Sequence, residues 1–343
     1  MFKKTTLAAF FFAAFTINVN AKEVLNLGSY GGSTETIFKE RIIPKFEQEN
    51  NVEIVYVAGN STDTLAKMVA QQKNPEFDVV LMDDGPLAQA VQFGLCGKVD
   101  DAPILNDLYD LAKVDETALA LGVIGTGLFY NSEAFEKAGY DAPDSWEDLT
   151  DSKFKGKVVI PPISNSYGLH TLIKFAELRG GGEEDIDPGF EAMIDEVGPN
   201  VLAWEPSPGK MTELFQNGEA ILGVWGSGRV HALKSTGFPV EFVYPKENGI
   251  TLVVGMCPVA GKGDKNPLAQ KFIQYLLSPE VQVILAEGQA WGPVNKTTDL
   301  EPEVAAKVPY GVDEINALQS VDWDIINENR ADWTQRWNRT VER

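Results

Sequence analysis

Short apolar runs alternate with amphipathic segments through the first part of the chain. Residues 24–27, 52–57 and 77–82 have the length and composition of buried strands, and each is followed by a loop rich in Gly, Asn or Asp. The segments between them repeat apolar residues at helical spacing, although Pro44 is expected to break the first helix. This alternation predicts an α/β fold with a mainly parallel sheet flanked by helices.

The same pattern starts again near the middle of the chain. Strands are expected at residues 158–160 and 220–225, and glycine-containing apolar segments at residues 118–130 and 250–259 separate the two units. We therefore predict two lobes, each with a mainly parallel sheet, joined by two crossing segments that serve as a hinge.

The chain is expected to leave the first lobe and to return to it. In this interpretation residues 22–124 and 251–310 form lobe one, and residues 125–250 form lobe two. The part that follows residue 278 is predicted to be helical. Residues 311–343, whose last stretch is rich in Trp and charge, are predicted to be helices that pack across both lobes.

The first 21 residues have the pattern of a secretory signal peptide. Lys3 and Lys4 precede a short apolar run over residues 7–17, and Val19 and Ala21 supply the small side chains of a cleavage site. We expect cleavage after Ala21 and a periplasmic location. Later segments contain no unbroken apolar run of about 18 residues, the length that a membrane-spanning helix needs.

Composition excludes several classes of protein. Acidic residues outnumber basic ones by 50 to 29, for a formal charge of −21, which disfavours binding to nucleic acid or to anionic membranes. With 2 histidines and 2 cysteines the chain is not expected to hold a zinc, iron–sulfur or multi-histidine site, and no metal or cofactor is predicted. In an oxidising compartment Cys96 and Cys257 are able to pair, but two separate buried thiols fit the sequence equally well.

Motifs for catalysis are not recognised in the sequence. Residues 225–228 lack the first glycine of a nucleophile elbow, and residues 261–265 match neither a phosphate-binding nor a dinucleotide-binding loop. Asp83 and Asp84 form a candidate acid/base pair, but adjacent side chains point in different directions, which favours one ligand contact plus helix capping. We therefore predict no catalytic residues, and keep a secreted enzyme using Asp83 and Asp84 as the alternative of another class.

Several segments resemble, in their order and spacing, those of a known family. They are residues 249–252 (GITL), 258–263 (PVAGKG), 269–280 (AQKFIQYLLSPE), 291–296 (WGPVNK) and 222–228 (LGVWGSG). The chain resembles a periplasmic solute-binding protein of an ABC importer, of the spermidine/putrescine-binding branch, whose relatives bind iron, thiamine and sugar phosphates.

That resemblance implies a two-lobe, type II periplasmic binding protein fold. It implies a monomer without cofactor that closes on one small-molecule ligand in the interlobe cleft and delivers it to the permease of an ABC transporter. A periplasmic sensor that presents its ligand to a membrane receptor remains an alternative with the same fold.

The residues expected to recognise the ligand depart from the polyamine branch. The resemblance gives Trp225 a stacking role and places Ser227 nearby, but Val253 and Gly255 stand where that branch has Trp and Asp. The loop over residues 161–168 is uncharged where the branch carries acids. Three expected contacts to a cation are thus missing, which disfavours spermidine and putrescine themselves.

What replaces them favours a small amine or zwitterion. Asp83 and Asp84 are candidates for an ammonium group, and residues 164–166 precede a helix whose free N–H groups either bind an anion or are capped. Thiamine and a sugar phosphate remain alternatives, whereas ferric iron is disfavoured because Tyr130 lacks an adjacent tyrosine. The candidate ligand-binding residues are Tyr30, Asn60, Ser61, Thr62, Asp83, Asp84, Ser164, Asn165, Ser166, Trp225, Ser227 and Val253.

Overall fold

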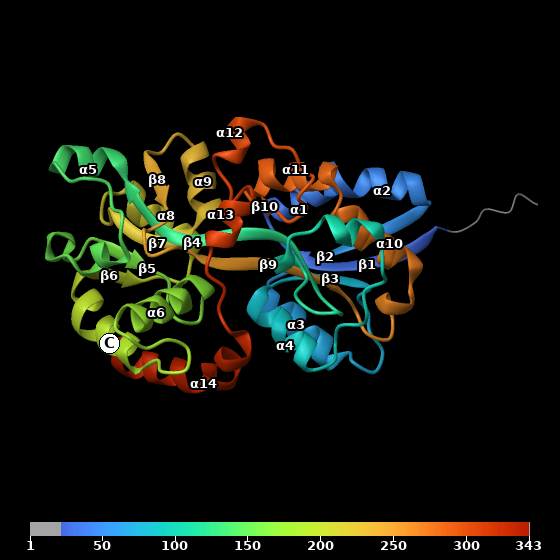
Figure 1. The fold of residues 1–343 in the computed structure, drawn as a ribbon, viewed down its shortest axis with the longest axis horizontal. Helices are drawn as coiled ribbons and strands as arrows, with labels where there is room; N and C mark the ends of the chain where they lie inside the picture. The colour runs from blue at the N-terminus through green and yellow to red at the C-terminus, as the bar shows by residue number, and fades with distance from the viewer. Residues whose placement is uncertain (1–21, 343) are drawn as a thin grey trace, which may run out of the picture.

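The computed structural model describes residues 22–342, so the predicted signal peptide lies outside the described residues. Within this part of the chain the strands form one ten-stranded mixed sheet in the order β2-β1-β3-β9-β4-β7-β5-β6, with β8 and β10 also paired to β4 (Figure 1). The strands are β1 (Glu23–Tyr30), β2 (Val52–Gly59), β3 (Val79–Asp83), β4 (Leu119–Asn131), β5 (Val158–Ile160), β6 (Val201–Trp204), β7 (Leu222–Gly226), β8 (Val240–Val243), β9 (Ile250–Pro258) and β10 (Gly292–Pro293).

Helices cover both ends of this sheet. The elements form two groups in Figure 1, one around β1, β2 and β3 and the other around β5, β6 and β7, and the strands within each group run parallel. The helices are α1 (Ser33–Ile37), α2 (Ile43–Asn50), α3 (Ser61–Ala70), α4 (Asp84–Gln92), α5 (Ser132–Ala138), α6 (Ser166–Leu178), α7 (Asp187–Ala192), α8 (Pro208–Gln216), α9 (Ser227–Ser235), α10 (Pro267–Leu276), α11 (Pro279–Gln289), α12 (Pro302–Ala305), α13 (Val312–Ala317) and α14 (Trp323–Thr340).

The first helical segment continues through Pro44 instead of breaking there. A π-helical turn, Phe38–Ile42, joins α1 to α2, and Pro44 lies in the first turn of α2. Proline lacks the N–H that an α-helix would need at this position, and its ring conflicts with the preceding carbonyl. The wider turn shifts the hydrogen-bond ladder just before the proline, which lets the helix proceed.

The two crossing segments are the central strands of the sheet. β4 and β9 pair antiparallel, and β4 then continues to pair with β7 and β8 of the second group. Nearly every residue of both strands is buried, which explains the long apolar runs in the sequence. The prediction of separate sheets is thus refined: one sheet passes from one group of elements to the other.

Three short strands were not predicted from the sequence. Strands β6 and β8 are half-exposed and carry no regular alternation of buried and exposed positions. Strand β10 interrupts the part of the chain that was predicted to be all helical, and it pairs with β4. This pairing places Trp291, the residue before β10, beside the middle of the sheet.

The long C-terminal helix α14 contacts both groups of elements. Its Asn327 accepts a hydrogen bond of 3.1 Å from Gln89 of α4, in the first group. Its Trp337 is fully buried against Trp204 of β6 and Phe190 of α7, in the second group. The helix therefore bridges the two groups along one side of the molecule (Figure 1).

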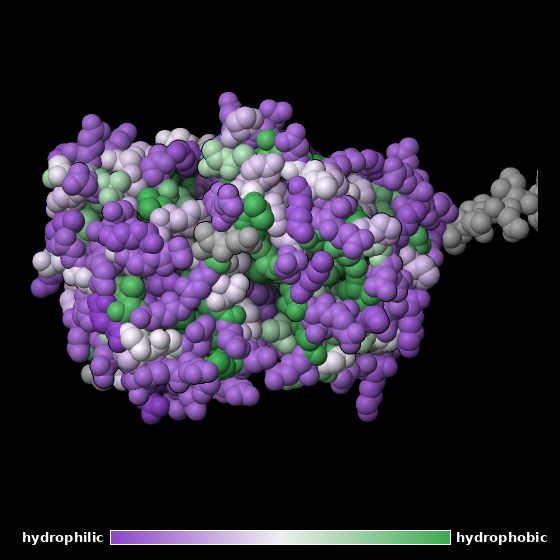
Figure 2. Space-filling view, in the orientation of Figure 1, coloured by the Kyte–Doolittle hydropathy of each residue, from purple (hydrophilic) through white to green (hydrophobic). Residues whose placement is uncertain are grey.

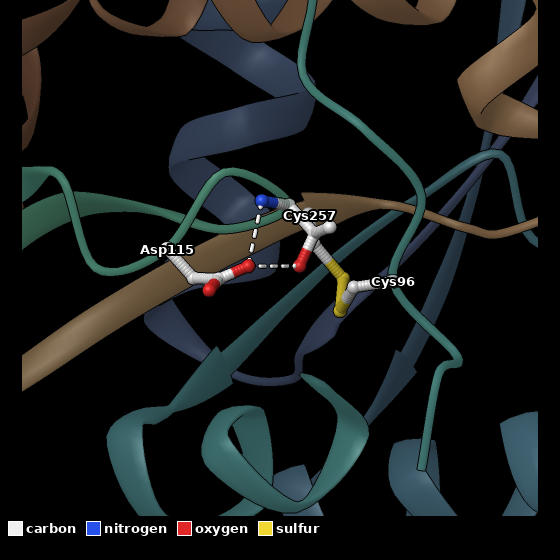
Figure 3. Close-up of a disulfide and its surroundings, with 4 residues drawn as sticks. Cys96, Asp115 and Cys257 are labelled. Atoms are coloured by element: carbon white, nitrogen blue, oxygen red, sulfur yellow. Dashed lines mark hydrogen bonds between the residues drawn. A yellow bond between two sulfur atoms is a disulfide. The ribbon is translucent and has the colours of Figure 1, made fainter. Parts of the chain in front are cut away.

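Cys96 and Cys257 form a disulfide, which decides the alternative that the sequence left open (Figure 3). Their Cα atoms are 5.6 Å apart, and the bond joins the loop after α4 to strand β9. Asp115 lies beside the bond in Figure 3, and its Oδ1 accepts hydrogen bonds from the backbone N–H and hydroxyl of Thr117.

The surface agrees with the acidic composition. Most of the face shown in Figure 2 is hydrophilic, and apolar side chains gather toward its middle, where the two groups of elements meet. Among residues 22–342 no helix combines the length and hydropathy needed to cross a membrane.

Candidate ligand-binding cleft

A cavity of about 870 Å³ opens between the two groups of elements. Its walls come from the carboxyl ends of strands and from the N-termini of the helices that follow them, α1, α3 and α4 on one side and α6 and α9 on the other. Helix α14 completes one edge with Arg330 and Thr334. A volume of about 300–1,000 Å³ is typical of sites for small molecules.

Eight of the residues predicted to contact a ligand line this cavity, and four do not. Those that line it are Tyr30, Asn60, Ser61, Thr62, Asp83, Ser164, Asn165 and Ser166. The four that lie outside the lining are Asp84, Trp225, Ser227 and Val253.

Asp83 carries the carboxylate that faces the cavity. It ends strand β3, beside β1, and Tyr30 at the end of β1 donates a hydrogen bond of 2.8 Å to its Oδ1. Burial raises the pKa of Asp83, and the Tyr30 hydroxyl and the guanidinium groups of Arg229 and Arg330 oppose that rise. Burial and the nearby carboxylate also hold the pKa of Tyr30 well above its usual range, so the phenol remains a donor.

Asp84, a candidate for the ammonium group of the ligand, accepts hydrogen bonds from the backbone instead. Its Oδ2 accepts the N–H of Val253 on β9 and its Oδ1 accepts the N–H of Gly85, both at 3.0 Å. Burial raises the pKa of Asp84 to about 7, against the effect of these hydrogen bonds. Asp84 and Val253 therefore contact each other and join α4 to β9, because neighbouring side chains leave a strand end in different directions.

Trp225 and Ser227, which the sequence placed at the ligand, contact the neighbouring strand instead. The Trp225 side chain is 4% exposed and packs on Phe129 of β4 at 5.4 Å between ring centroids. The hydroxyl of Ser227 accepts the N–H of Gly125 at 3.3 Å. Trp225 lies inside β7, and its ring is covered by Phe129 instead of opening into the cavity.

The cavity has an aromatic side chain that the sequence had not assigned to it. Trp291 packs edge-to-face against Tyr30, with 6.1 Å between centroids, and both rings line the cavity. Gly122 of β4 permits this approach, since a methyl group there would lie 2.8 Å from the Cβ of Trp291. Trp291, Tyr30 and Asp83 thus bring two aromatic rings to the neighbourhood of the carboxylate.

The cavity also has basic side chains, close enough to Asp83 to interact with its charge. Arg229 of α9 and Arg330 of α14 both line it, and Nη2 of Arg330 donates to the backbone oxygen of Ser164 at 3.4 Å. Arg229 interacts with the hydroxyl of Tyr167 on α6. The two guanidinium groups therefore flank the N-terminus of α6, where backbone N–H groups and the helix dipole add positive potential.

Two asparagines of the cavity also cap helices. The Asn60 side chain accepts the N–H of Asp63 in α3 at 2.8 Å, and that of Asn165 accepts the N–H of Tyr167 in α6 at 2.9 Å. Capping, which the sequence left open beside ligand binding, is therefore present at both positions. Both residues also line the cavity.

Trp323 fastens the helix that carries Arg330. Its indole covers Gly85 so closely that a methyl group at that position would lie 2.7 Å from Cζ3. The indole also lies beside the ring of His170, with 6.3 Å between the ring centroids, and the Arg330 guanidinium lies 5.9 Å from its ring centroid. His170 pairs with the hydroxyl of Thr126 at 2.8 Å, and burial lowers its pKa to about 3.

Sequence reasoning missed Arg229, Trp291 and Arg330. Arg229 directly follows the segment 222–228, and Trp291 opens the segment 291–296, so both lay beside recognised motifs. Arg330 lies far along the chain in a helix with no motif, and only the docking of α14 brings it to the cavity.

Across residues 22–342 no group of three or more His, Cys, Asp and Glu side chains is arranged to hold a metal ion.

The profile of the family described as bacterial extracellular solute-binding protein matches residues 41–310 of the chain. The chain belongs to this family. Its members serve ABC transporters as solute-binding components of the bacterial periplasm or cell exterior, and they are transport proteins rather than enzymes.

Three relatives with named ligands are 23–24% identical to this protein. The spermidine/putrescine-binding periplasmic protein of Salmonella typhimurium is 23% identical, over 77% of both chains. The γ-aminobutyric acid-binding protein of Pseudomonas aeruginosa is 23% identical over 92% of this chain and 90% of the relative. The putative 2-aminoethylphosphonate-binding periplasmic protein of Salmonella paratyphi A is 24% identical over 87% of this chain and 86% of the relative.

Solved structures agree with the fold. The crystal structure of an ABC transporter from Clostridium perfringens is 26% identical and superposes with a TM-score of 0.78, over 92% of this chain and 99% of that one. The predicted fold, a type II periplasmic binding protein of α/β class, is confirmed, as is the resemblance to the spermidine/putrescine-binding branch.

Proposed function

We propose that this solute-binding protein captures a small zwitterion, a molecule with an amine at one end and an acidic group at the other. In this proposal the solute lies in the cleft, contacts Asp83 through its amine and contacts Arg229 and Arg330 through its acid. The protein then delivers it, as a periplasmic monomer released by signal-peptide cleavage, to the permease of an ABC importer.

The proposal rests on one observation: acidic and basic side chains line the same cavity. Asp83 supplies a carboxylate, and Arg229 and Arg330 supply two guanidinium groups. When the cleft closes and excludes water, each pair of opposite charges interacts more strongly than it would in solvent. A solute that matches both ends gains from both, whereas one with a single charged group leaves the other end unpaired.

The aromatic side chains support the amine end of this orientation. An ammonium group at Asp83 would lie beside the rings of Tyr30 and Trp291, which attract cations and pack against methylene groups. The Tyr30 hydroxyl already occupies Oδ1 of Asp83, which orients the carboxylate before the solute arrives.

The names of two relatives point the same way. γ-Aminobutyric acid and 2-aminoethylphosphonate, named for the Pseudomonas and Salmonella relatives, each join an amine to an acid. A polyamine would bring a second ammonium group toward Arg229 and Arg330, and like charges repel. A sugar phosphate would pair with the arginines but leave Asp83 without a cation, and thiamine would suit Asp83 but not the arginines.

Closure on the solute is expected to bend strands β4 and β9. These strands are the ones that pass between the two groups of elements, and the solute shifts the population toward the form that closes around it. The closed form would be the one presented to the permease.

The test combines recovery of the natural solute with a defined panel. Small molecules released by denaturing protein purified from its native periplasm are identified by mass spectrometry. The emptied protein is then tested for thermal stabilisation by 4-aminobutanoate, 2-aminoethylphosphonate, putrescine and butanoate. We expect an amine with an acid group to be recovered intact, and a rise in Tm with at least one of the first two compounds only. Recovery of a diamine, a simple anion or a turnover product would overturn the proposal, and would favour polyamine transport, anion transport or an enzyme, respectively.

A further inference from the structure

The charges of the side chains that line the cleft do not add up to zero, as they would in a site matched to a neutral zwitterion such as an ordinary amino acid. The titratable residues that line the cavity are Tyr30, Asp83, Tyr167, Arg229, His231, Glu287 and Arg330.

Four of these contribute no net charge near pH 7. Burial raises the pKa of both tyrosines, that of Tyr167 to about 12, and burial lowers the pKa of His231. The carboxylate of Glu287 is paired with Arg41 at 2.7 Å. Among the groups that line the cavity, Asp83, Arg229 and Arg330 therefore leave one positive charge in excess.

A solute with one ammonium and one carboxylate has no net charge, so this excess would remain when the cleft closes. A solute with one ammonium and a doubly charged phosphoryl group would neutralise it. Resting on the proposed function, we infer that the acidic group of the solute is a phosphoryl dianion, the terminal group of an aminoalkyl phosphonate or of an amino-alcohol phosphate.

The donors around the α6 N-terminus fit such a group. A planar carboxylate uses one bidentate guanidinium well, but a tetrahedral phosphoryl group offers three oxygens to donors that converge from different directions. Here Arg330 approaches beside Ser164, Arg229 approaches beside Tyr167, and helix α6 begins between them. The second helix that starts at this wall, α9, has no side-chain cap on its first turn, which leaves its N–H groups free for an anion.

Asp84 lies behind this arrangement and not in it. Burial lowers the pKa of Arg330, and the carboxylates of Asp84 and Asp83 oppose that fall, so Asp84 lies close to this guanidinium. Its own oxygens accept backbone N–H groups, and it does not line the cavity. Burial raises the pKa of Asp84 to about 7, so an incoming dianion would favour its protonated form and leave both guanidinium groups to pair with the solute.

The experiment compares four ethylamines that differ only in the acidic group. Dissociation constants are measured by calorimetry at pH 7.5 for 2-aminoethylphosphonate, O-phosphoethanolamine, taurine and β-alanine. Taurine is tetrahedral but singly charged, and β-alanine is planar and singly charged, so the series separates charge from shape. We expect at least one phosphoryl compound to bind ten times or more tightly than taurine and β-alanine.

Repeating the series at pH 5 gives a second readout. The phosphoryl group loses its second charge below a pKa of about 6, so its advantage over taurine is expected to shrink several-fold. Any loss of charge at Asp83 on acidification would weaken all four compounds alike, because they share the amine. A preference for the phosphonate over the phosphate, or the reverse, would show whether the cleft takes an aminoalkyl phosphonate or an amino-alcohol phosphate.

Variants on one helix connect the preference to Arg330. Arg330→Gln is expected to reduce the ratio between the phosphoryl compound and taurine at least threefold. Arg336→Gln is the matched control, because Arg336 lies on the same helix, pairs with Asp187 and does not line the cavity. That control is expected to leave the ratio unchanged.

The outcomes distinguish this inference from the proposed function. Equal or tighter binding of β-alanine would overturn the phosphoryl dianion and leave the zwitterion standing. Taurine as tight as the phosphoryl compounds at both pH values would also overturn it, because shape rather than charge would then be recognised. If none of the four binds and 4-aminobutanoate does not bind either, the proposed function itself is wrong.

Discussion

The hydroxyl of Tyr30 donates a hydrogen bond of 2.8 Å to Oδ1 of Asp83, and both side chains line the cleft. Removing this donor with Tyr30→Phe is expected to weaken binding of the amine by about 0.5–1.5 kcal/mol, which raises Kd about 2- to 10-fold. Titration calorimetry with the best ligand of the panel measures this change.

Tyr275→Phe is a matched control for that substitution. The Tyr275 hydroxyl also donates one hydrogen bond, of 3.0 Å, to the backbone oxygen of Ile42, but the residue does not line the cavity. Its Kd should equal that of the wild type. Equal effects of the two substitutions would mean that Tyr30 has no specific role at the amine.

Gly85 is expected to tolerate no side chain, because Trp323 covers it at close range. Gly85→Ala would force the indole, and with it the helix that carries Arg330, out of place. Overpacking of this kind lowers the free energy of unfolding by about 1–3 kcal/mol. We expect this loss in denaturant unfolding, together with weaker solute binding.

Gly209→Ala controls for the change from glycine to alanine. Gly209 is the second residue of α8, as Gly85 is of α4, and the nearest atom to a methyl group there would be 3.8 Å away. This variant should be as stable as the wild type or slightly more stable. If Gly85→Ala behaves in the same way, Trp323 does not fasten α14.

Asp84 and His170 lie on either side of Trp323 and are expected to give opposite pH dependences. Burial raises the pKa of Asp84 from 3.8 to about 7 and lowers that of His170 from 6.5 to about 3. The contribution of Asp84 to stability is therefore greatest at low pH and is lost as the pH rises toward 7. The contribution of His170 is present above pH about 6.5 and is lost as the pH falls.

Between about pH 5 and 6.5 these two contributions largely cancel in the wild type. With Asp84→Asn, the free energy of unfolding should rise with pH by up to about 1.4 kcal/mol per pH unit. With His170→Gln it should fall with pH by a similar amount. Guanidinium unfolding at both ends of this range gives the slopes, and identical slopes in all three proteins would contradict the assignment.

The disulfide is expected to stabilise the protein without affecting recognition. It joins Cys96 to Cys257 across 161 positions of the chain and lies outside the cavity lining. Replacing both cysteines by serine should lower the free energy of unfolding by about 2–5 kcal/mol. Denaturant unfolding measures the loss, and a change of Kd in the same variant would show that the bond also shapes the cleft.

Much of the fold could be predicted from the sequence because its strongest signals are local. The strands β1, β2, β3, β5 and β7 are apolar runs that end at loops, and they occur close to where the pattern predicted them. Strands β6 and β8 gave too weak a pattern, since they are short and half-exposed.

Residues of the candidate site could be predicted from the sequence only where their position along a strand determines that they lie at the cleft. Asp83 and Tyr30 are the last residues of their strands, and such residues meet at the edge of a parallel sheet. Trp225 was misplaced because the sequence does not tell which face of a buried strand a side chain takes. Arg330 could not be predicted, because its place depends on the packing of Trp323 and Trp337 against elements far away in the chain.

The most direct test of the central claim asks whether Asp83 recognises the amine of the solute. Calorimetry compares wild type and Asp83→Asn with 2-aminoethylphosphonate and ethylphosphonate, or with 4-aminobutanoate and butanoate if the carboxylate binds more tightly. We predict that the substitution raises Kd for the amine-containing compound at least tenfold and does not weaken binding of its amine-free analogue. An equal loss for both compounds, or no loss for either, would contradict the account.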